Sequence, residues 1–130
     1  MTQQLGVLTN VGLVPVASAF TWRFLITSDG TATGTPTNLT GRTYKFVMRR
    51  VKPSGKVDNV SAPIFSTTSI TFTSVNGTND AADISFLSTS LPIATVAEGD
   101  VSCALWRTDD PNDRPEAETL AHIYHPAAQA

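Results

Sequence analysis

Two histidines close to the carboxyl end are the first residues whose types and spacing could support chemistry. His122 and His125 form an H-x-x-H pair in the segment AHIYHP. Imidazole is a common ligand for transition metals. The flanking residues, however, alternate as in a β-strand, where side chains three residues apart point to opposite faces. The two rings would therefore diverge, and the sequence predicts no metal site at this place.

Carboxylates gather just before these histidines, in the segment RTDDPNDRPEAE. A calcium-binding loop would need oxygen ligands at alternate positions and a glycine at its sharp turn. Pro111 and Arg114 interrupt any such pattern, and the segment contains no glycine. We also find no carboxylate in an apolar run that would raise its pKa for acid catalysis. We interpret the segment as a solvated hairpin between the last two strands.

Nucleophilic chemistry has no candidate either. Cys103 is the single cysteine, so no internal disulfide can form. It alternates with Val101 and Leu105, and we expect it to be a small buried side chain. No serine stands in a nucleophile elbow, and no glycine-rich loop ends in Gly-Lys-Ser/Thr. The sequence predicts no catalytic residue, no cofactor and no enzymatic activity.

The composition favours strands over helices. The chain has 130 residues, of which 41% are hydrophobic and only 15% charged, and it holds 19 Thr and 11 Ser. A threonine-rich, charge-poor sequence is typical of β-structure, and this length suits one domain. The net charge of −2 disfavours a general nucleic-acid binder. No apolar stretch approaches the roughly 18 residues of a membrane span.

Short alternating segments separated by turns predict the fold class. We expect strands over residues 20–26, 44–48, 70–72, 84–86, 101–107 and 118–124. The segments KPSGK and NGTND are the clearest turns between them. Residues 88–96 are the one helix-like candidate, and Pro92 limits them to about one turn. This spacing predicts a single all-β antiparallel sandwich of about seven strands over residues 20–125, with a short tail at 126–130.

One of these strands follows an elaborate turn, in the segment GTPTNLTGRTYKFVMRR. Pro36 fixes its own φ, and Gly41 is expected to take a positive φ. Asn38 and Thr40 can form hydrogen bonds to nearby backbone. Behind the turn, the aromatic residues and the methionine of 44–48 share one side of the strand and are expected to face a core.

The first 19 residues form an arm or a first strand without any charged side chain. They lack the basic start and the unbroken apolar stretch of a secretory signal. Their larger aliphatic residues are Leu5, Val7, Leu8, Val11, Leu13, Val14 and Val16. Such a segment must be buried, in its own sandwich or against a neighbouring subunit. Because Gly12 and Pro15 weaken a long regular strand, we expect the part before Asn10 to reach outward and contact another protein.

Charge is unevenly distributed along the chain. Six of the nine basic residues lie between Arg42 and Lys56, and seven of the eleven acidic ones lie from Glu98 onward. One interpretation is a solvated basic strand. The alternative is a contact between the basic hairpin of one copy and the acidic end of a neighbour in an ordered assembly. The candidate contact residues are Leu5, Val7, Leu8, Arg49, Arg50, Asp109 and Asp110.

The segment FTWRFLITSDGTATGTPTNLTGRTYKFVMRR resembles a module of tailed-bacteriophage virion proteins. In that module an aromatic strand and a polar loop lead to a G-x-P-x-x-L-T-G turn, followed by a strand that ends in arginine. The positions of the turn are occupied by Gly34, Pro36, Leu39, Thr40 and Gly41. The later segment DISFLSTSLPIATVAEGDVSCALWRTDD is similar to the remaining strands and final hairpin of the family, so the resemblance covers residues 20–124.

The resemblance implies an immunoglobulin-like sandwich, as in the amino-terminal domains of baseplate upper proteins and tail-fibre adaptors, which dock fibres to the tail. We therefore expect a non-enzymatic structural protein of the virion, made in the bacterial host cytoplasm. Its partners would be copies of itself and other virion proteins, with no nucleic acid and no membrane. A head decoration or neck protein is the alternative within this class. From another class, a carbohydrate-binding adhesive module would use exposed aromatics such as Trp22 or Trp106, of which Trp106 falls out of phase with the expected core.

Overall fold

Most strands of the chain alternate between buried and more exposed side chains, so each has an inner and an outer face. The computed structural model describes residues 5–8, 12–31, 33–110 and 114–126, and these residues form nine strands and no helix. The strands are β1 (Leu5–Leu8), β2 (Leu13–Pro15), β3 (Phe20–Ile26), β4 (Tyr44–Arg50), β5 (Phe65–Thr67), β6 (Ile70–Thr73), β7 (Ala81–Phe86), β8 (Gly99–Arg107) and β9 (Ala117–Tyr124).

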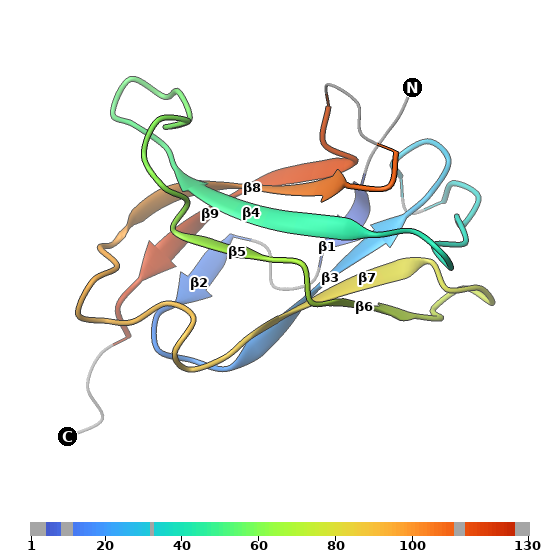
Figure 1. Cartoon of the computed structure of the whole chain (residues 1–130), viewed down its shortest axis with the longest axis horizontal. Coiled ribbons are helices and arrows are strands. Elements are labelled where there is room, and N and C mark those ends of the chain that lie inside the picture. Colours follow the sequence, from blue (N-terminus) through green and yellow to red (C-terminus); the bar gives the residue numbers. More distant parts are fainter. Residues whose placement is uncertain (1–4, 9–11, 32, 111–113, 127–130) are drawn as a thin grey trace.

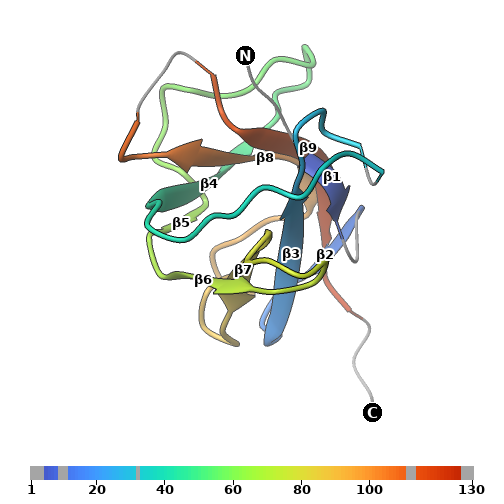
Figure 2. The same cartoon turned by 90° about the vertical axis from the view of Figure 1, so that its right-hand side faces the viewer.

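The strands are arranged in two sheets, one above the other in Figure 1 and seen from the side in Figure 2. One sheet has the order β1–β3–β7–β6, and the other has the order β2–β9–β8–β4–β5. Neighbouring strands pair antiparallel, except that β2 runs parallel to β9. The all-β class predicted from the sequence is confirmed, with more strands than the seven or so that the alternation indicated.

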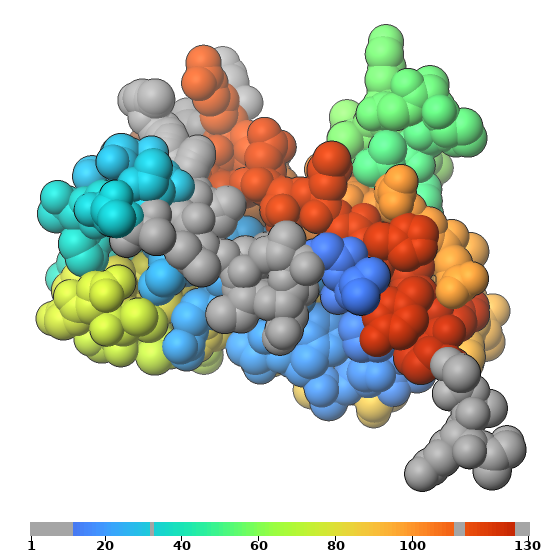
Figure 3. All heavy atoms as spheres, turned by 180° about the vertical axis from the view of Figure 1, so that it is seen from behind, coloured from blue at the N-terminus to red at the C-terminus, as the bar shows by residue number. Residues whose placement is uncertain are grey.

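Two connections project from the five-stranded sheet. The connection between β4 and β5, green in Figure 3, lies at one end, and the segment between β8 and β9, orange, lies at the other. Because β4 and β8 are antiparallel, Arg50 at the end of β4 pairs with Val101 near the start of β8. The two projections therefore stand at opposite ends of the same strands, and Figure 1 shows both rising on the same side of the molecule.

Aromatic side chains from both sheets meet between them. Trp22 of β3 and Phe86 of β7 come from the four-stranded sheet, Phe46 of β4 comes from the five-stranded sheet, and all three are buried. The ring centroids of Trp22 and Phe46 lie 6.2 Å apart, and those of Phe46 and Phe86 lie 5.9 Å apart, both edge to face. Such pairs add about 0.5–1.5 kcal/mol each beyond area burial. Trp22 is thus a core residue, which corrects its expected place among the exposed aromatics.

The six strands predicted from alternation are present as β3, β4, β6, β7, β8 and β9. The apolar residues of β4 and β8 that were expected to face the core are buried. β5 has no counterpart among the predicted strands, because three residues are too few to display a period. Residues 88–96 contain no helix but two turns: the Leu87 carbonyl accepts a hydrogen bond from the Ser90 N–H, and the Pro92 carbonyl accepts hydrogen bonds from the N–H groups of Thr95 and Val96.

The amino-terminal segment contributes one strand to each sheet. β1 pairs with β3 at the edge of the four-stranded sheet, and β2 pairs with β9 at the edge of the five-stranded sheet. Gly12, with a φ of 102°, lies just before β2, and Val14 and Val16 are buried in the core. The expectation that the part before Asn10 reaches outward is wrong for Leu5–Leu8, because that stretch pairs within the protein's own sheet. Residues 1–4 and 9–11 lie outside the described residues.

The turn in front of β4 closes one end of the space between the sheets. Leu39 is fully buried, and its backbone N–H donates a hydrogen bond to the carbonyl of Asn79 in the β6–β7 turn. Gly41 has a φ of 87°, as the sequence predicts, and Asn38 accepts a hydrogen bond from the Thr40 N–H. Leu39 therefore anchors the loop in the core, and Gly41 turns the chain into β4.

Gly34 lies in a tighter place than the sequence suggests. A Cβ on this residue would lie 2.1 Å from Oδ1 of Asp29 and 2.9 Å from Oγ1 of Thr27. Asp29 is held beside it by hydrogen bonds of 2.9 Å from the backbone N–H and the hydroxyl of Thr31. Gly34 is thus more tightly surrounded than Gly41, which has nothing within 4 Å of an added Cβ, because other side chains of the loop fill the space.

We expect Gly34→Ala to destabilise the fold at least as much as Gly41→Ala. The first substitution must displace an anchored carboxylate. The second places a Cβ on a left-handed residue, at a cost of about 1–2 kcal/mol. Melting temperatures measure both effects, and the Asp29→Ala background should reduce the loss caused by Gly34→Ala but not the loss caused by Gly41→Ala. An undiminished Gly34→Ala effect in that background would contradict the contact with Asp29.

Deleting residues 1–8 should lower the melting temperature by several degrees. The deletion removes β1 and leaves β3 without a partner along one edge. At this chain length, each 1 kcal/mol of stability corresponds to about 2–8 °C. Differential scanning calorimetry measures the change, and deletion of residues 127–130, predicted from the sequence as tail, is the control. An unchanged melting temperature after the first deletion would restore the interpretation of this segment as an outward arm.

Candidate interaction surface

The outer face of the five-stranded sheet is hollowed because its middle strand carries small side chains there. The antiparallel register places Val47, Ala104 and Glu118 in one row across β4, β8 and β9. The adjacent row contains Arg49 and Ser102 on β4 and β8. The small residues of β8 thus lie beside larger ones on the neighbouring strands. Because cross-strand neighbours are about 5 Å apart, this size difference leaves a groove along the strand.

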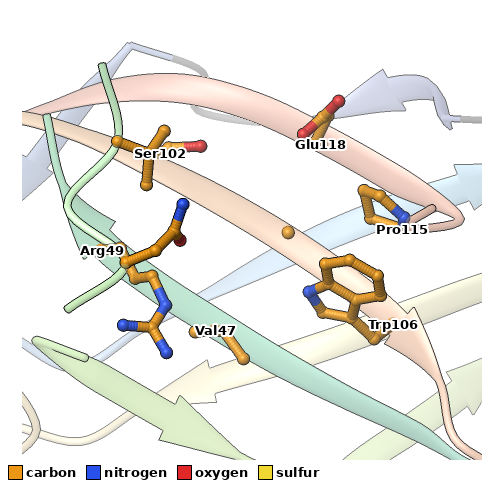
Figure 4. A pocket seen from close by; sticks show the side chains of 9 residues that line it. Val47, Arg49, Ser102, Trp106, Pro115 and Glu118 are labelled. Atoms are coloured by element: carbon orange, nitrogen blue, oxygen red, sulfur yellow. The ribbon is translucent and has the colours of Figure 1, made fainter. Parts of the chain in front are cut away.

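Trp106 forms one end of this groove. It follows Ala104 by two residues on the same face of β8 and is half-buried, which confirms the prediction that it lies outside the core. Figure 4 shows its indole ring beside Pro115, with the nitrogen-bearing edge of the ring toward the hollow. The hollow has a volume of about 230 Å³.

The two projecting connections supply the remaining walls. Val57 and Asn59 come from the connection between β4 and β5, and Pro115 comes from the residues just before β9. These walls stand at opposite ends of the sheet. The groove therefore has a wall at each end, an apolar floor and polar groups on its rim.

Two charged side chains line the groove, and their charges cancel. Arg49 donates one hydrogen bond of 2.8 Å from Nη1 to the carbonyl of Ser61, which holds the guanidinium near the β4–β5 connection. Glu118 is exposed and has no hydrogen-bond partner within the part of the chain that the structure describes. Of the candidate contact residues whose side chains the structure describes, Arg49 alone lines this groove.

Asp109 and Asp110, two other candidate contact residues, are engaged within their own hairpin. Arg107 donates hydrogen bonds of 3.1 and 3.0 Å to Asp109 and one of 3.4 Å to Asp110. The Thr43 N–H donates another to Asp109 at 3.1 Å. The Arg107 guanidinium first, and then this backbone N–H, lower the pKa of Asp109 to about 2. These carboxylates clamp the end of the hairpin to the start of β4.

The charge separation along the sequence is only partly kept in space. Asp100 lies at the basic end of β4, because β8 runs antiparallel to it. Arg50 donates a hydrogen bond of 3.0 Å to the carbonyl of Ala97 and packs over Gly99, whose φ is 147°. Acidic and basic residues therefore share this end of the sheet, and this weakens the expected head-to-tail pairing of charges.

The two histidines have separate partners, in line with the divergence expected on a strand. Nδ1 of His122 lies 2.8 Å from Oδ1 of Asp100, and Nε2 of His125 lies 2.8 Å from the carbonyl oxygen of Val96. Among the described residues, no group of three or more His, Cys, Asp or Glu is placed to hold a metal ion.

Buried reactive groups serve the fold. Cys103 is fully buried, as expected, and burial raises the pKa of its thiol to about 12. Asp83 is buried in β7, but this burial does not give it the raised pKa of an acid catalyst. Burial alone would raise the pKa of Asp83, but two hydrogen bonds from Arg23 and one from Thr73 outweigh it and lower this pKa. Asp83 is therefore half of a structural ion pair.

Sequence reasoning identified Trp106 and Arg49 separately but missed the groove that they share. The one local signal is the segment VSCALW, where small residues precede the tryptophan on the face opposite Cys103. Which residues flank these small ones depends on the register between strands. The linear sequence does not show that register.

No known family of proteins matches this chain, and no curated protein sequence is significantly similar to it. The described residues include no helix that is long and apolar enough to cross a membrane. The fold and the surface define the protein as an all-β domain of two sheets, with an open groove on the outer face of one sheet.

Arg107→Ala should raise the pKa of the Asp109 carboxyl from about 2 toward its ordinary value of 3.8. The folded-state pKa is depressed, so the stability that this carboxylate adds is complete above about pH 4 and is lost as the pH falls through about 2. Carboxyl carbon shifts followed by NMR against pH measure both values. Asp29, whose pKa is lowered by hydrogen bonds from Thr31, is the internal control and should not change. An Asp109 pKa that stays near 2 in the variant would contradict the clamp.

Proposed function

We propose that this chain is a non-enzymatic structural protein of a bacteriophage virion, in the tail, the baseplate or the fibre attachment. The observation that carries the proposal is the turn shared with the virion module, from Gly34 to Gly41. In the fold this turn has a structural role that would explain its residue types. Leu39 is the buried anchor, and Gly41 has the positive φ that favours glycine.

The strand order supports an immunoglobulin-like sandwich. In the nomenclature of that fold, β1, β3, β7 and β6 correspond to strands A, B, E and D of one sheet. β9, β8 and β4 correspond to G, F and C of the other, with β5 as an additional strand beside C. β2 corresponds to a second half of the first strand that has crossed to the other sheet. This strand order supports the architecture that the resemblance implies.

An apolar open edge supports assembly in multiple copies. Among the described residues, β2 is the last strand on its side of the five-stranded sheet, and one side of its backbone has no strand partner within them. Leu13 on β2 is 60% exposed, and Leu120 on β9 is 66% exposed. Leu13 is in register with His122, and Leu120 lies two residues before His122 on the same face. Aliphatic side chains beside an open edge suit a contact with a strand of another subunit.

Electron microscopy of particles produced in the bacterial host, with gold-labelled antibodies against this chain, tests the proposal. We expect label at repeated positions on the tail, baseplate or fibre attachment. Label on the neck or head would favour the alternative position within the virion. Particles without label would overturn the structural role.

A matched pair of variants tests the edge. The double substitution Leu13→Glu and Leu120→Glu should leave the chain folded but exclude it from particles, because it charges the apolar edge. Ser66→Glu, at an exposed position of β5 on the opposite edge, should be incorporated normally. Equal incorporation of both variants would show that the β2 edge is not an assembly contact.

A further inference from the structure

We propose that the groove on the outer face of the five-stranded sheet binds one neutral sugar ring of a glycan, with Trp106 as its stacking platform. This site adjoins the β2 edge, because Leu120 is in register with Ser102, but the proposal does not depend on a role in the virion. The shape of the floor, the polar groups around it, the opposite charges of its two charged side chains and its volume support this assignment.

The indole ring of Trp106 lies at one end of the apolar floor. Trp106 is half-buried, so its ring is held by the protein while its nitrogen-bearing edge is toward the hollow. Ala104 lies beside it with only a methyl group, and Val47 extends the apolar surface on the next strand. A pyranose ring presents C–H bonds on one face and hydroxyls around its edge. Its C–H face can pack against the electron-rich face of an indole, as other apolar groups do.

The rim supplies both donors and acceptors, as hydroxyls require. The Glu118 carboxylate accepts hydrogen bonds, and Arg49 has further N–H donors besides the one directed at Ser61. Asn59 and Ser102 also line the groove and can each donate or accept. Hydrogen bonds between hydroxyls and charged groups are stronger than those between neutral groups. This mixture suits a polyhydroxylated ring.

The charge and the volume of the groove further restrict the class of ligand that it can bind. Arg49 and Glu118, the two charged side chains of the lining, have opposite charges, so the lining itself carries no excess positive charge for an anion. Exposed Lys45 lies beside the lining, across from Trp106. The volume of about 230 Å³ is below the range of about 300–1,000 Å³ typical of pockets for drug-sized ligands. One ring fills the hollow, and the rest of a glycan chain would extend over the open face of the sheet.

An apolar side chain from another protein fits this groove less well. It would pack on Ala104 and Trp106, but it would cover the carboxylate of Glu118 without offering it a donor. Covering a charge without giving it a partner is costly, and so is removing hydrogen bonds to water from a polar rim. The polar rim therefore favours a sugar over an apolar anchor.

Titration of the isolated chain with sugars tests the proposal. The probes are the methyl glycosides of glucose, galactose, mannose and N-acetylglucosamine, together with a neutral-oligosaccharide array. Trp22 is fully buried, so changes in tryptophan fluorescence and in acrylamide quenching report on Trp106. We expect at least one neutral sugar to bind and to protect Trp106 from the quencher. Absence of binding to every probe would overturn the proposal.

Three variants locate the binding. Trp106→Ala removes the platform and Ala104→Leu fills the floor, and each should weaken binding about tenfold or more without changing the core. Because Trp106→Ala removes the fluorescent reporter, saturation-transfer NMR measures binding in all variants. Leu120→Ala, on the same face but outside the groove, should bind within about twofold of the unmodified chain. Equal weakening by Leu120→Ala, or full binding by Ala104→Leu, would overturn the assignment to this groove.

The outcome is independent of the virion proposal, because sugar binding is measured on the isolated chain and antibody labelling on particles. If Trp106→Ala blocked incorporation into particles while no probe sugar bound, the groove would be a protein contact and the sugar proposal would be wrong.

Discussion

The contact between aromatic rings of the two sheets is the interaction on which the other features depend. Trp22 and Phe86 from one sheet meet Phe46 from the other, and all three are fully or almost fully buried. Once these rings occupy the interior, the two-residue period of a strand determines which side chains face outward. The residues that alternate with these aromatic residues along β3 and β4, such as Arg23 and Val47, therefore lie on the outer faces.

The groove is a consequence of this constraint. Cys103 and Leu105 face inward, so Ala104 and Trp106 must face outward on β8. The pairing of β8 with β4 and β9 then brings Val47 and Glu118 to either side of Ala104. No loop has to fold over the sheet to create the floor of the hollow, and the two end connections supply only its walls. A binding surface of this kind is as rigid as the sheet that carries it.

The two proposed roles use different parts of the same sheet. The contact with other subunits is assigned to the β2 edge, where Leu13 and Leu120 are exposed. The sugar site is assigned to the groove at Trp106, nearer the middle strand. Arg107 forms an ion pair with Asp109, and Arg23 forms one with Asp83. These charges are paired within the chain, so they stabilise the two sheets and do not act as free charges for a partner.

The sequence by itself determined the features that depend on near neighbours. Alternation predicted six strands and the inward faces of β4 and β8, and a glycine before a strand predicted the positive φ of Gly41. Tertiary structure alone decided the pairing of β1 with β3, the burial of Trp22 and the tight packing of Asp29 against Gly34. It also set the register that forms the groove. The reason is physical: periodicity and backbone φ are local, whereas register and packing depend on contacts between residues distant in the chain.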